Sequence, residues 1–263
     1  MPVHYEKANG VGTVTLSRPA ARNAWGQDLT DGLRESFHDM EEDDDIRCAV
    51  LTGDESGNAF SAGANLKDPK THTVASVADF IKGIPNYRRS MPFDVLSNFP
   101  KPIIAAVNGY AVGIGCIITF CCDLIVASDR AEWRLPQVGL GILPAYGGAP
   151  RLAQWVGKGL AMRVSLGFPL KAEEAYRIGL AQWLVPHQEL SAQTAEVAGH
   201  IAGLPPLSAR MVKESLASGM NIGNMGDAAL ADLYRFMALE LTEDKAEGHD
   251  AWREKRPAVF KGR

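Results

Sequence analysis

Short apolar stretches alternate with helical patterns through the first half of the chain. Residues 11–16 (VGTVTL) alternate apolar and polar side chains in part and predict a strand. The next apolar side chains recur at helical spacing, namely Leu29, Leu33, Phe37 and Met40. This spacing predicts a helix that begins after the N-cap Asp28 and ends at the acidic run 41–45.

Three continuously apolar runs predict buried strands, and they lie at 46–51, 102–107 and 123–127. The second run is followed by a glycine-containing turn and an apolar helix over about 113–122. A further helix is expected within residues 75–98. The repeated order of strand, turn, helix and strand indicates a coiled or layered α/β core.

From about Tyr146 onward the pattern is helical almost throughout. The last helices are expected at 207–218, 226–241 and 243–256, after a break at Pro205-Pro206. We therefore divide the chain into an α/β core, residues 1–203, and a helical C-terminal region, residues 204–263. A stripe of large apolar side chains in that region is typical of a core or an oligomer interface, and its members are Leu230, Leu233, Tyr234, Met237 and Leu241.

Composition narrows the class of protein. The 263 residues are 46% hydrophobic and 22% charged, with a net charge of −4, which excludes a disordered chain and disfavours a nucleic-acid binder. The apolar run 102–122 is long enough to span a membrane, but Asn108 and three glycines interrupt it, so we expect no membrane span. The N-terminus lacks the pattern of a signal peptide, and we expect a cytoplasmic protein with four buried, reduced cysteines and no metal site.

Several catalytic motifs are missing from the sequence. There is no phosphate-binding P-loop, no complete dinucleotide fingerprint and no H-E-x-x-H pair. The segment Ala59 to Gly63 lacks the first glycine of a G-x-S-x-G elbow, which disfavours a serine hydrolase of that kind.

Two segments rich in small residues carry the chemical signal. They are AFSAGANLKD (59–68) and NGYAVGIGC (108–116), and the second opens an apolar helix. N–H groups at a helix N-terminus lack partners and lie at the positive end of its dipole. Two such turns facing each other would aim two N–H groups at one oxygen, as an oxyanion hole does. From spacing alone, tight turns between core elements are the favoured explanation of the two segments.

These two segments are part of a longer set of sequence segments that together form a recognisable pattern. In chain order the series is LSRPAARNAW (16–25), AFSAGANLKD, KPIIAAVNGYAVGIGC (101–116), CDLIVAS (122–128), PQVGLGILPAYGGAPRL (136–152), the A-x-x-A-x-x-x-G-L-A turn ending at Ala181, and EKRPAVFKGR (254–263). Together they resemble the crotonase, or enoyl-CoA hydratase/isomerase, superfamily. The resemblance implies an α/β spiral of β-β-α turns with C-terminal trimerisation helices, in a homotrimer or a dimer of trimers.

The resemblance also implies a ligand and the groups that bind it. The ligand is an acyl-CoA thioester; CoA is part of the substrate, and no cofactor is tightly bound. By motif position the two oxyanion-hole N–H groups belong to Ala64 and Ile114. The positions that match CoA contacts are Arg22, Ala24, Ala62, Asn65, Leu66 and Lys255, the last reaching CoA phosphate from a neighbouring subunit.

The chain departs from the family at its catalytic acids. The positions that hold two glutamates in hydratases are Ile117 and Gln137, and a third acidic site of some isomerases is Ala145. An isoleucine carries no proton, and a glutamine orients water but is no general base near neutral pH. We therefore expect crotonyl-CoA hydration to be very slow or absent.

Other side chains are candidates for proton transfer or substrate binding. Tyr146 adjoins the vacant third site and is interpreted either as a proton donor or as an aromatic lining the pocket. His72 follows in a loop after Ala64, where an exposed histidine is the alternative. Weaker candidates are Tyr87, Arg88, Arg89, Trp133 and Arg134.

Three functions stay open at this point. The first is a lyase or isomerase of CoA thioesters with unconventional proton handling, which includes decarboxylation and C–C cleavage. The second is an acyl-CoA-binding protein without turnover. The third is an oligomeric scaffold, which the intact glycine turns disfavour.

Overall fold

The computed structural model describes residues 2–67, 76–78, 81 and 92–263, and it contains two sheets with helices around them. The larger sheet has six strands in the order β1-β2-β3-β5-β7-β10, and only β1 and β2 pair antiparallel. Its strands are β1 (Val3–Ala8), β2 (Val11–Leu16), β3 (Cys48–Gly53), β5 (Ile103–Val107), β7 (Leu124–Ser128) and β10 (Trp183–Val185).

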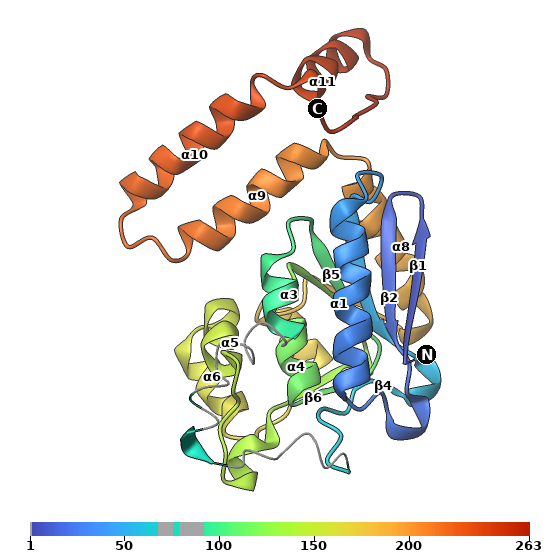
Figure 1. Cartoon of the computed structure of the whole chain (residues 1–263), viewed down its shortest axis with the longest axis vertical. Coiled ribbons are helices and arrows are strands. Elements are labelled where there is room, and N and C mark those ends of the chain that lie inside the picture. Colours follow the sequence, from blue (N-terminus) through green and yellow to red (C-terminus); the bar gives the residue numbers. More distant parts are fainter. Residues whose placement is uncertain (1, 68–75, 79–80, 82–91) are drawn as a thin grey trace.

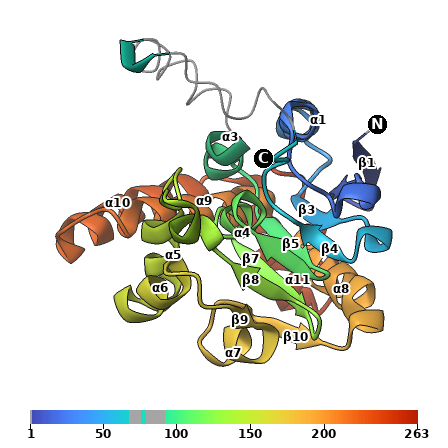
Figure 2. The ribbon, with the colours of Figure 1, turned by 90° about the horizontal axis from the view of Figure 1, so that it is seen from below.

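The central strands of this sheet are apolar throughout because helices cover both of its faces. Cys48 and Val50 of β3 pack toward α8 (Leu190–Ala202), whereas Ala49 and Leu51 pack into the main core on the other face. Figure 2 shows α8 on one side of the sheet and α1 (Gln27–Glu42) on the other. The three buried strands expected from continuous apolar runs are thereby confirmed.

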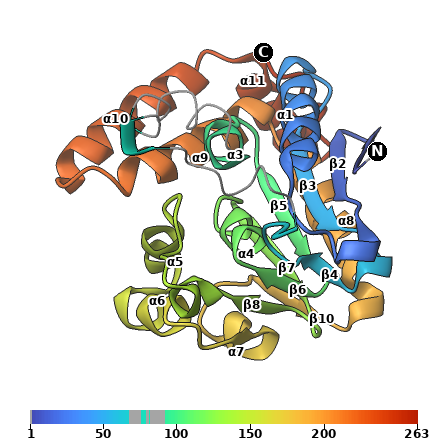
Figure 3. The ribbon, with the colours of Figure 1, turned by 60° about the horizontal axis from the view of Figure 1, so that its bottom comes forward.

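The second sheet consists of short strands in the order β4-β6-β8-β9. They are β4 (Ala59–Ser61), β6 (Tyr110–Val112), β8 (Glu132–Arg134) and β9 (Leu170–Lys171). β4 and β6 pair in parallel beside α4 (Ile114–Thr119), as Figure 3 shows. Each of these two strands lies within one of the glycine-rich segments and leads directly into its turn, so the sheet holds the two turns next to each other.

Two details of the helical expectations are wrong. The N-cap of α1 is Gly26 rather than Asp28, whose carboxylate pairs instead with Arg18. β9 and β10 interrupt the region after Tyr146, which had been expected to be helical almost throughout. The remaining helices of the core are α3 (Pro92–Asn98), α5 (Gly148–Val156), α6 (Lys158–Ser165) and α7 (Ala172–Arg177).

The three C-terminal helices lie where the pattern placed them. They are α9 (Pro206–Gly219), α10 (Met225–Leu239) and α11 (Glu243–Glu254), and Figure 1 shows α9 and α10 side by side as a hairpin extending from the body. The apolar stripe of α10 does not belong to the core of this chain. Leu233, Tyr234 and Met237 are all more than half exposed. No helix in the described part of the chain is long and apolar enough to cross a membrane.

Candidate active site

The two glycine-rich turns face each other. Gly63 and Gly113 adopt φ values of +89° and +55°, which favour glycine. A Cβ built on Gly63 would lie 3.8 Å from the Cα of Gly113 and only 2.8 Å from the carbonyl oxygen of Val112. Only residues without side chains let the two backbones approach this closely, and each glycine is followed directly by one of the two candidate donors, Ala64 and Ile114.

Trp25 fixes the direction of the first turn. Its N–H donates to the Gly63 carbonyl at 2.7 Å, and its carbonyl accepts the N–H of Asn65 at 2.8 Å. Ala64 lies between these two bonds in a parallel bridge, so its own N–H points away from Trp25. Ile114 is the first residue of α4, where an N–H has no partner within the helix.

Two buried polar side chains support the first turn, and sequence reasoning missed both. Asn23, fully buried, donates from its amide to the Asp54 and Ala59 carbonyls. Ser61 donates to the Asn23 carbonyl at 2.7 Å and accepts the N–H of Gly63 at 3.3 Å. In the sequence, Ser61 stands out as a polar side chain among apolar and small residues, whereas Asn23 follows Arg22 and carries no such signal.

Gly115 lets the second turn pack onto the first. A Cβ on Gly115 would lie 2.6 Å from the Cβ of Ser61 and 2.8 Å from its carbonyl oxygen. The same serine therefore supports the first turn and packs against the second, which couples the two candidate donors.

Gln137 lies beside these donors. It belongs to a short 3₁₀ helix, Pro136–Leu140, and its Nε2 is 3.6 Å from a Cβ built on Gly113. Its Oε1 is buried and has no hydrogen-bond partner among the described residues. A buried amide oxygen of this kind is costly to leave unpaired, so it is suited to accept a hydrogen bond from a ligand or a water molecule.

The other two acid positions carry apolar side chains, one buried and one exposed. Ile117 is 1% exposed, and its Cδ1 lies 2.8 Å from a Cβ built on Gly148 at the start of α5. Ala145 precedes that glycine in the chain and carries no ionisable group. Tyr146, held at a φ of +58°, stacks on Phe93 of α3 with ring centroids 4.8 Å apart. Tyr146, next to Ala145 in the chain, therefore packs against α3 as an aromatic side chain.

The weaker candidates separate into described and undescribed residues. His72, Tyr87, Arg88 and Arg89 lie outside the described residues. Trp133 is wrong as a candidate, because it is completely buried and donates to the Thr119 hydroxyl in the core. Arg134 pairs with Glu132, and its carbonyl accepts the N–H of Gly113.

The residues matched to CoA contacts gather at the first turn, with one exception. The Arg22 carbonyl accepts the N–H of Ala62 at 2.9 Å, and Asn65 and the exposed Leu66 follow directly. Ala24 is buried next to Trp25, Ala62 and Asn65 are half-buried, and only Arg22 and Leu66 are exposed. Lys255 ends α11, at the opposite end of the molecule from β4 and β6 in Figure 1. It does not reach this turn within one chain.

The four cysteines are free and buried, as expected. Burial raises the pKa of the Cys121 thiol to about 11, so it is a poor nucleophile. Within the residues described, His, Cys, Asp and Glu form no cluster able to hold a metal ion.

Comparison with known proteins agrees with this geometry. The profile of the enoyl-CoA hydratase/isomerase family matches residues 6–263. The chain belongs to this family. The mitochondrial enoyl-CoA hydratase of Pongo abelii is 34% identical over 258 residues, which cover 97% of this chain and 85% of the relative.

Two further relatives support the family assignment. The 2,3-dehydroadipyl-CoA hydratase of Escherichia coli K12 is 35% identical over 251 residues, covering 95% of this chain and 94% of the relative. The crystal structure of an enoyl-CoA hydratase from Bacillus anthracis superposes with a TM-score of 0.91 at 27% identity, over the full length of both chains. The α/β crotonase fold with C-terminal helices is confirmed, and family members act on CoA thioesters without tightly bound cofactors.

Proposed function

We propose that this member binds an acyl-CoA thioester through the N–H groups of Ala64 and Ile114 and stabilises an enolate without a carboxylate base. The observation that carries the proposal is the contrast between two close-packed glycine turns and the uncharged side chains of Ile117, Gln137 and Ala145 at the positions matched to the family's acids. Two backbone donors stabilise negative charge on the thioester oxygen. With no carboxylate at the three positions matched to the family's acids, addition of water to an enoyl thioester is expected to be slow.

The reaction that fits such a site forms the enolate by breaking a carbon–carbon bond of the substrate. No base then has to remove a proton from Cα. In the decarboxylation of a 2-carboxyacyl thioester, the bond from Cα to the carboxylate breaks and carbon dioxide leaves. The electron pair passes to the enolate, whose oxygen accepts the two N–H bonds, and Cα then takes a proton. The apolar side chain of Ile117 favours loss of the charged carboxylate, because an unpaired charge is costly in an apolar environment. Cleavage of a 3-keto thioester passes through the same enolate.

Tyr146 is the proton donor in this proposal, and Gln137 orients the acyl group or a water molecule. The experiment is incubation of the purified protein with malonyl-CoA, crotonyl-CoA and acetoacetyl-CoA, with product analysis by mass spectrometry. We expect acetyl-CoA and carbon dioxide from malonyl-CoA and negligible hydration of crotonyl-CoA. Tyr146→Phe keeps the stack on Phe93, so a loss of turnover with unchanged binding would assign the proton to the hydroxyl. Binding of all three thioesters without turnover would instead favour an acyl-CoA-binding protein.

We also propose that the chain assembles as a homotrimer or a dimer of trimers. The exposed stripe of α10 supports this, because a large apolar patch on a helix face marks an interaction surface. Lys255 then meets the CoA of a neighbouring subunit, which is consistent with its distance from the first turn of its own chain.

A further inference from the structure

Arg18 contacts the backbone that supports the first turn with two of its groups. Its guanidinium Nη1 donates to the Ala24 carbonyl at 2.9 Å, and its backbone N–H donates to the Oδ1 of the buried Asn23 at 2.9 Å. The guanidinium also pairs with the carboxylate of Asp28. The proposed function gives this arginine no role, because it lies two peptide groups away from the candidate donor Ala64.

These two planar peptide groups connect the guanidinium with the Ala64 N–H. The Ala24 carbonyl shares its peptide group with the Trp25 N–H, which donates to the Gly63 carbonyl at 2.7 Å. The Gly63 carbonyl in turn shares its peptide group with the Ala64 N–H. In a trans peptide group the C=O and the N–H point in opposite directions, so the hydrogen bonds form one continuous chain. The guanidinium lies at one end of this chain, and the Ala64 N–H lies at the other.

Ser61 and Asn23 hold the chain in place. The Ser61 hydroxyl donates to the Asn23 carbonyl at 2.7 Å and accepts the N–H of Gly63 at 3.3 Å. Arg22 and Asn23 adopt φ values of +53° and +55°, which residues with a side chain seldom do. Such conformations persist only where the surrounding bonds over-determine them. The segment next to Arg18 is therefore held in one arrangement.

Burial strengthens the electrostatic effect of Arg18 on this chain. Ala24 and Trp25 are 8% and 4% exposed, and the Arg18 side chain is 24% exposed. Hydrogen bonds in such surroundings polarise one another, and a cationic donor makes the strongest bond of the series. The Asp28 side chain is 50% exposed, so water screens its opposite charge more strongly. The positive charge of the guanidinium thus acts on the peptide groups.

The second donor has a similar chain without a charge. The Gly113 carbonyl, in the same peptide group as the Ile114 N–H, accepts the N–H of Ile117 at 3.0 Å. The carbonyl in that next peptide group belongs to Cys116 and accepts the Thr119 hydroxyl at 2.7 Å. Within the described part of the chain, no charged side chain donates to either carbonyl.

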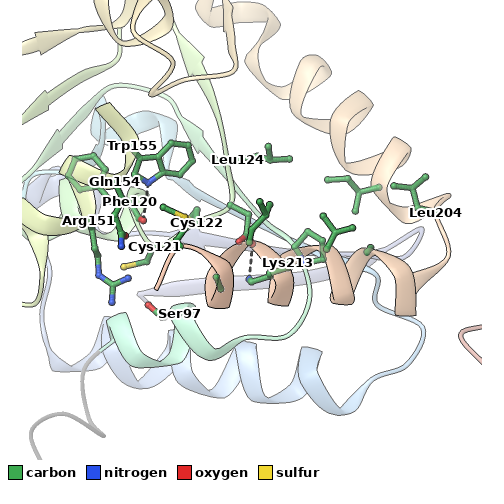
Figure 4. A pocket seen from close by; sticks show the side chains of 18 of the residues that line it. Ser97, Phe120, Cys121, Cys122, Leu124, Arg151, Gln154, Trp155, Leu204 and Lys213 are labelled. Atoms are coloured by element: carbon green, nitrogen blue, oxygen red, sulfur yellow. Dashed lines mark hydrogen bonds and ion pairs between the residues drawn. The ribbon is translucent and has the colours of Figure 1, made fainter. Parts of the chain in front are cut away.

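The charges beyond the end of α4 do not join this second chain. Figure 4 shows Cys121 and Cys122 there, at a separate cavity of about 700 Å³ beneath α9. Lys213 lines this cavity and pairs with the Asp123 carboxylate at 2.7 Å. The Nε of Arg151, which also lines it, has no hydrogen-bond partner among the residues described. A charged donor therefore serves the first turn and not the second.

We propose that Arg18 is a positioning residue of the candidate active site, which aims and polarises the Ala64 N–H through the two peptide groups between them. The inference rests on the proposed function, because it takes Ala64 as a donor to the thioester oxygen. A polarised N–H is a stronger donor, and its effect grows as that oxygen gains negative charge. Arg18 thereby stabilises the enolate without touching it.

The experiment compares the affinities of the full-length protein for acetyl-CoA and for S-ethyl-CoA, which lacks the carbonyl oxygen, by calorimetry. In Arg18→Gln we expect the preference for acetyl-CoA to fall about three- to tenfold, with the affinity for S-ethyl-CoA unchanged. The infrared C=O stretch of bound acetyl-CoA, labelled with ¹³C at the carbonyl, is expected to rise toward its value in water. Arg163→Gln is the matched control, because Arg163 pairs with Glu174 and donates to no backbone carbonyl. It is expected to change neither readout.

Two further variants separate polarisation from support by the ion pair. Asp28→Asn removes the ion pair but keeps the guanidinium charge, so we expect a preference at least as large as in the wild type and a C=O stretch no higher. Arg18→Lys keeps the charge without the planar fork, and we expect a smaller loss than in Arg18→Gln. The Asp28→Asn result does not depend on whether Arg18→Gln folds.

Distinct outcomes overturn the two proposals. An unchanged preference in a folded Arg18→Gln variant would refute the role of Arg18, and so would an equal loss of affinity for both ligands. If Asp28→Asn loses the preference as Arg18→Gln does, the ion pair acts as a structural support and the inference also fails. A wild type that binds acetyl-CoA no better than S-ethyl-CoA, or binds neither, would refute the proposed function itself.

Discussion

The backbone of the two turns and the side chains around them differ in what they retain of the family pattern. Gly63, Gly113 and Gly115 are present and tightly packed, and they depend on Ser61 and Asn23 beneath them. The positions that the family resemblance matches to catalytic acids of hydratases and isomerases carry an isoleucine, a glutamine and an alanine. Under the proposed function, carbonyl activation is built into the fold, whereas the choice of reaction rests on a few side chains whose replacement leaves the fold intact.

The largest expected effect comes from removing one backbone donor. Ala64→Pro deletes an N–H, and we expect it to lower turnover of any active thioester about 100-fold or more. Ala64→Gly keeps the N–H and is the matched control. Affinity for acetyl-CoA, compared with a CoA thioether that lacks the carbonyl, provides a readout independent of turnover. A carbonyl-dependent preference that persists in a folded Ala64→Pro variant would show that the turns do not bind the thioester.

A smaller effect is expected from separating the two turns. Gly115→Ala introduces a methyl group 2.6 Å from the Cβ of Ser61, so the turns must move apart. We expect a loss of about 1–3 kcal/mol in the free energy of unfolding and weaker thioester binding. Gly159→Ala, in α6 with open space around it, is the control and should be neutral or stabilising by up to about 1 kcal/mol. Denaturant unfolding of both variants measures the difference, and equal stabilities would contradict the close packing.

The smallest expected effect is a pH-dependent loss of order in the C-terminal tail, next to Lys255. Arg256 holds the Glu247 carboxylate, and the N–H of Val259 donates to it at 2.8 Å. These bonds lower the pKa of Glu247 to about 2. Because its folded pKa lies below the ordinary value near 4.5, this stabilisation is present above that pH and is lost as the pH falls toward 2.

Hydrogen exchange at the Val259 amide, corrected for its intrinsic rate, measures this loss directly. We expect protection to decrease across that pH range in the wild type, and to be low at every pH in Glu247→Gln. Unchanged protection in the variant would show that the carboxylate does not order the tail.

The difference between the turns and the side chains around them also explains how much could be predicted from the sequence. β3, β5 and β7 were predictable because both of their faces are buried, which makes each run apolar throughout. β1 (VHYEKA) was missed because it is a largely exposed edge strand, and β4, β6 and β8 because three residues are too few to show a period. The turns could be located from their glycines.

The surroundings of the turns depend on contacts between distant segments. Nothing near Gln137 in the sequence indicates that its amide lies against Gly113. The stack of Tyr146 on Phe93, 53 positions apart, and the support of the turns by Asn23 likewise follow only from the assembled fold.

The central claim is that this protein activates a thioester without the carboxylates that hydration requires. The most direct test is the rate of crotonyl-CoA hydration by the purified wild type and by the double variant Ile117→Glu with Gln137→Glu, both checked for folding and for butyryl-CoA binding. We predict that the wild type binds butyryl-CoA and hydrates crotonyl-CoA no faster than background, and that the double variant gains at least about 100-fold in rate. A wild-type rate near that of an efficient hydratase would contradict the account.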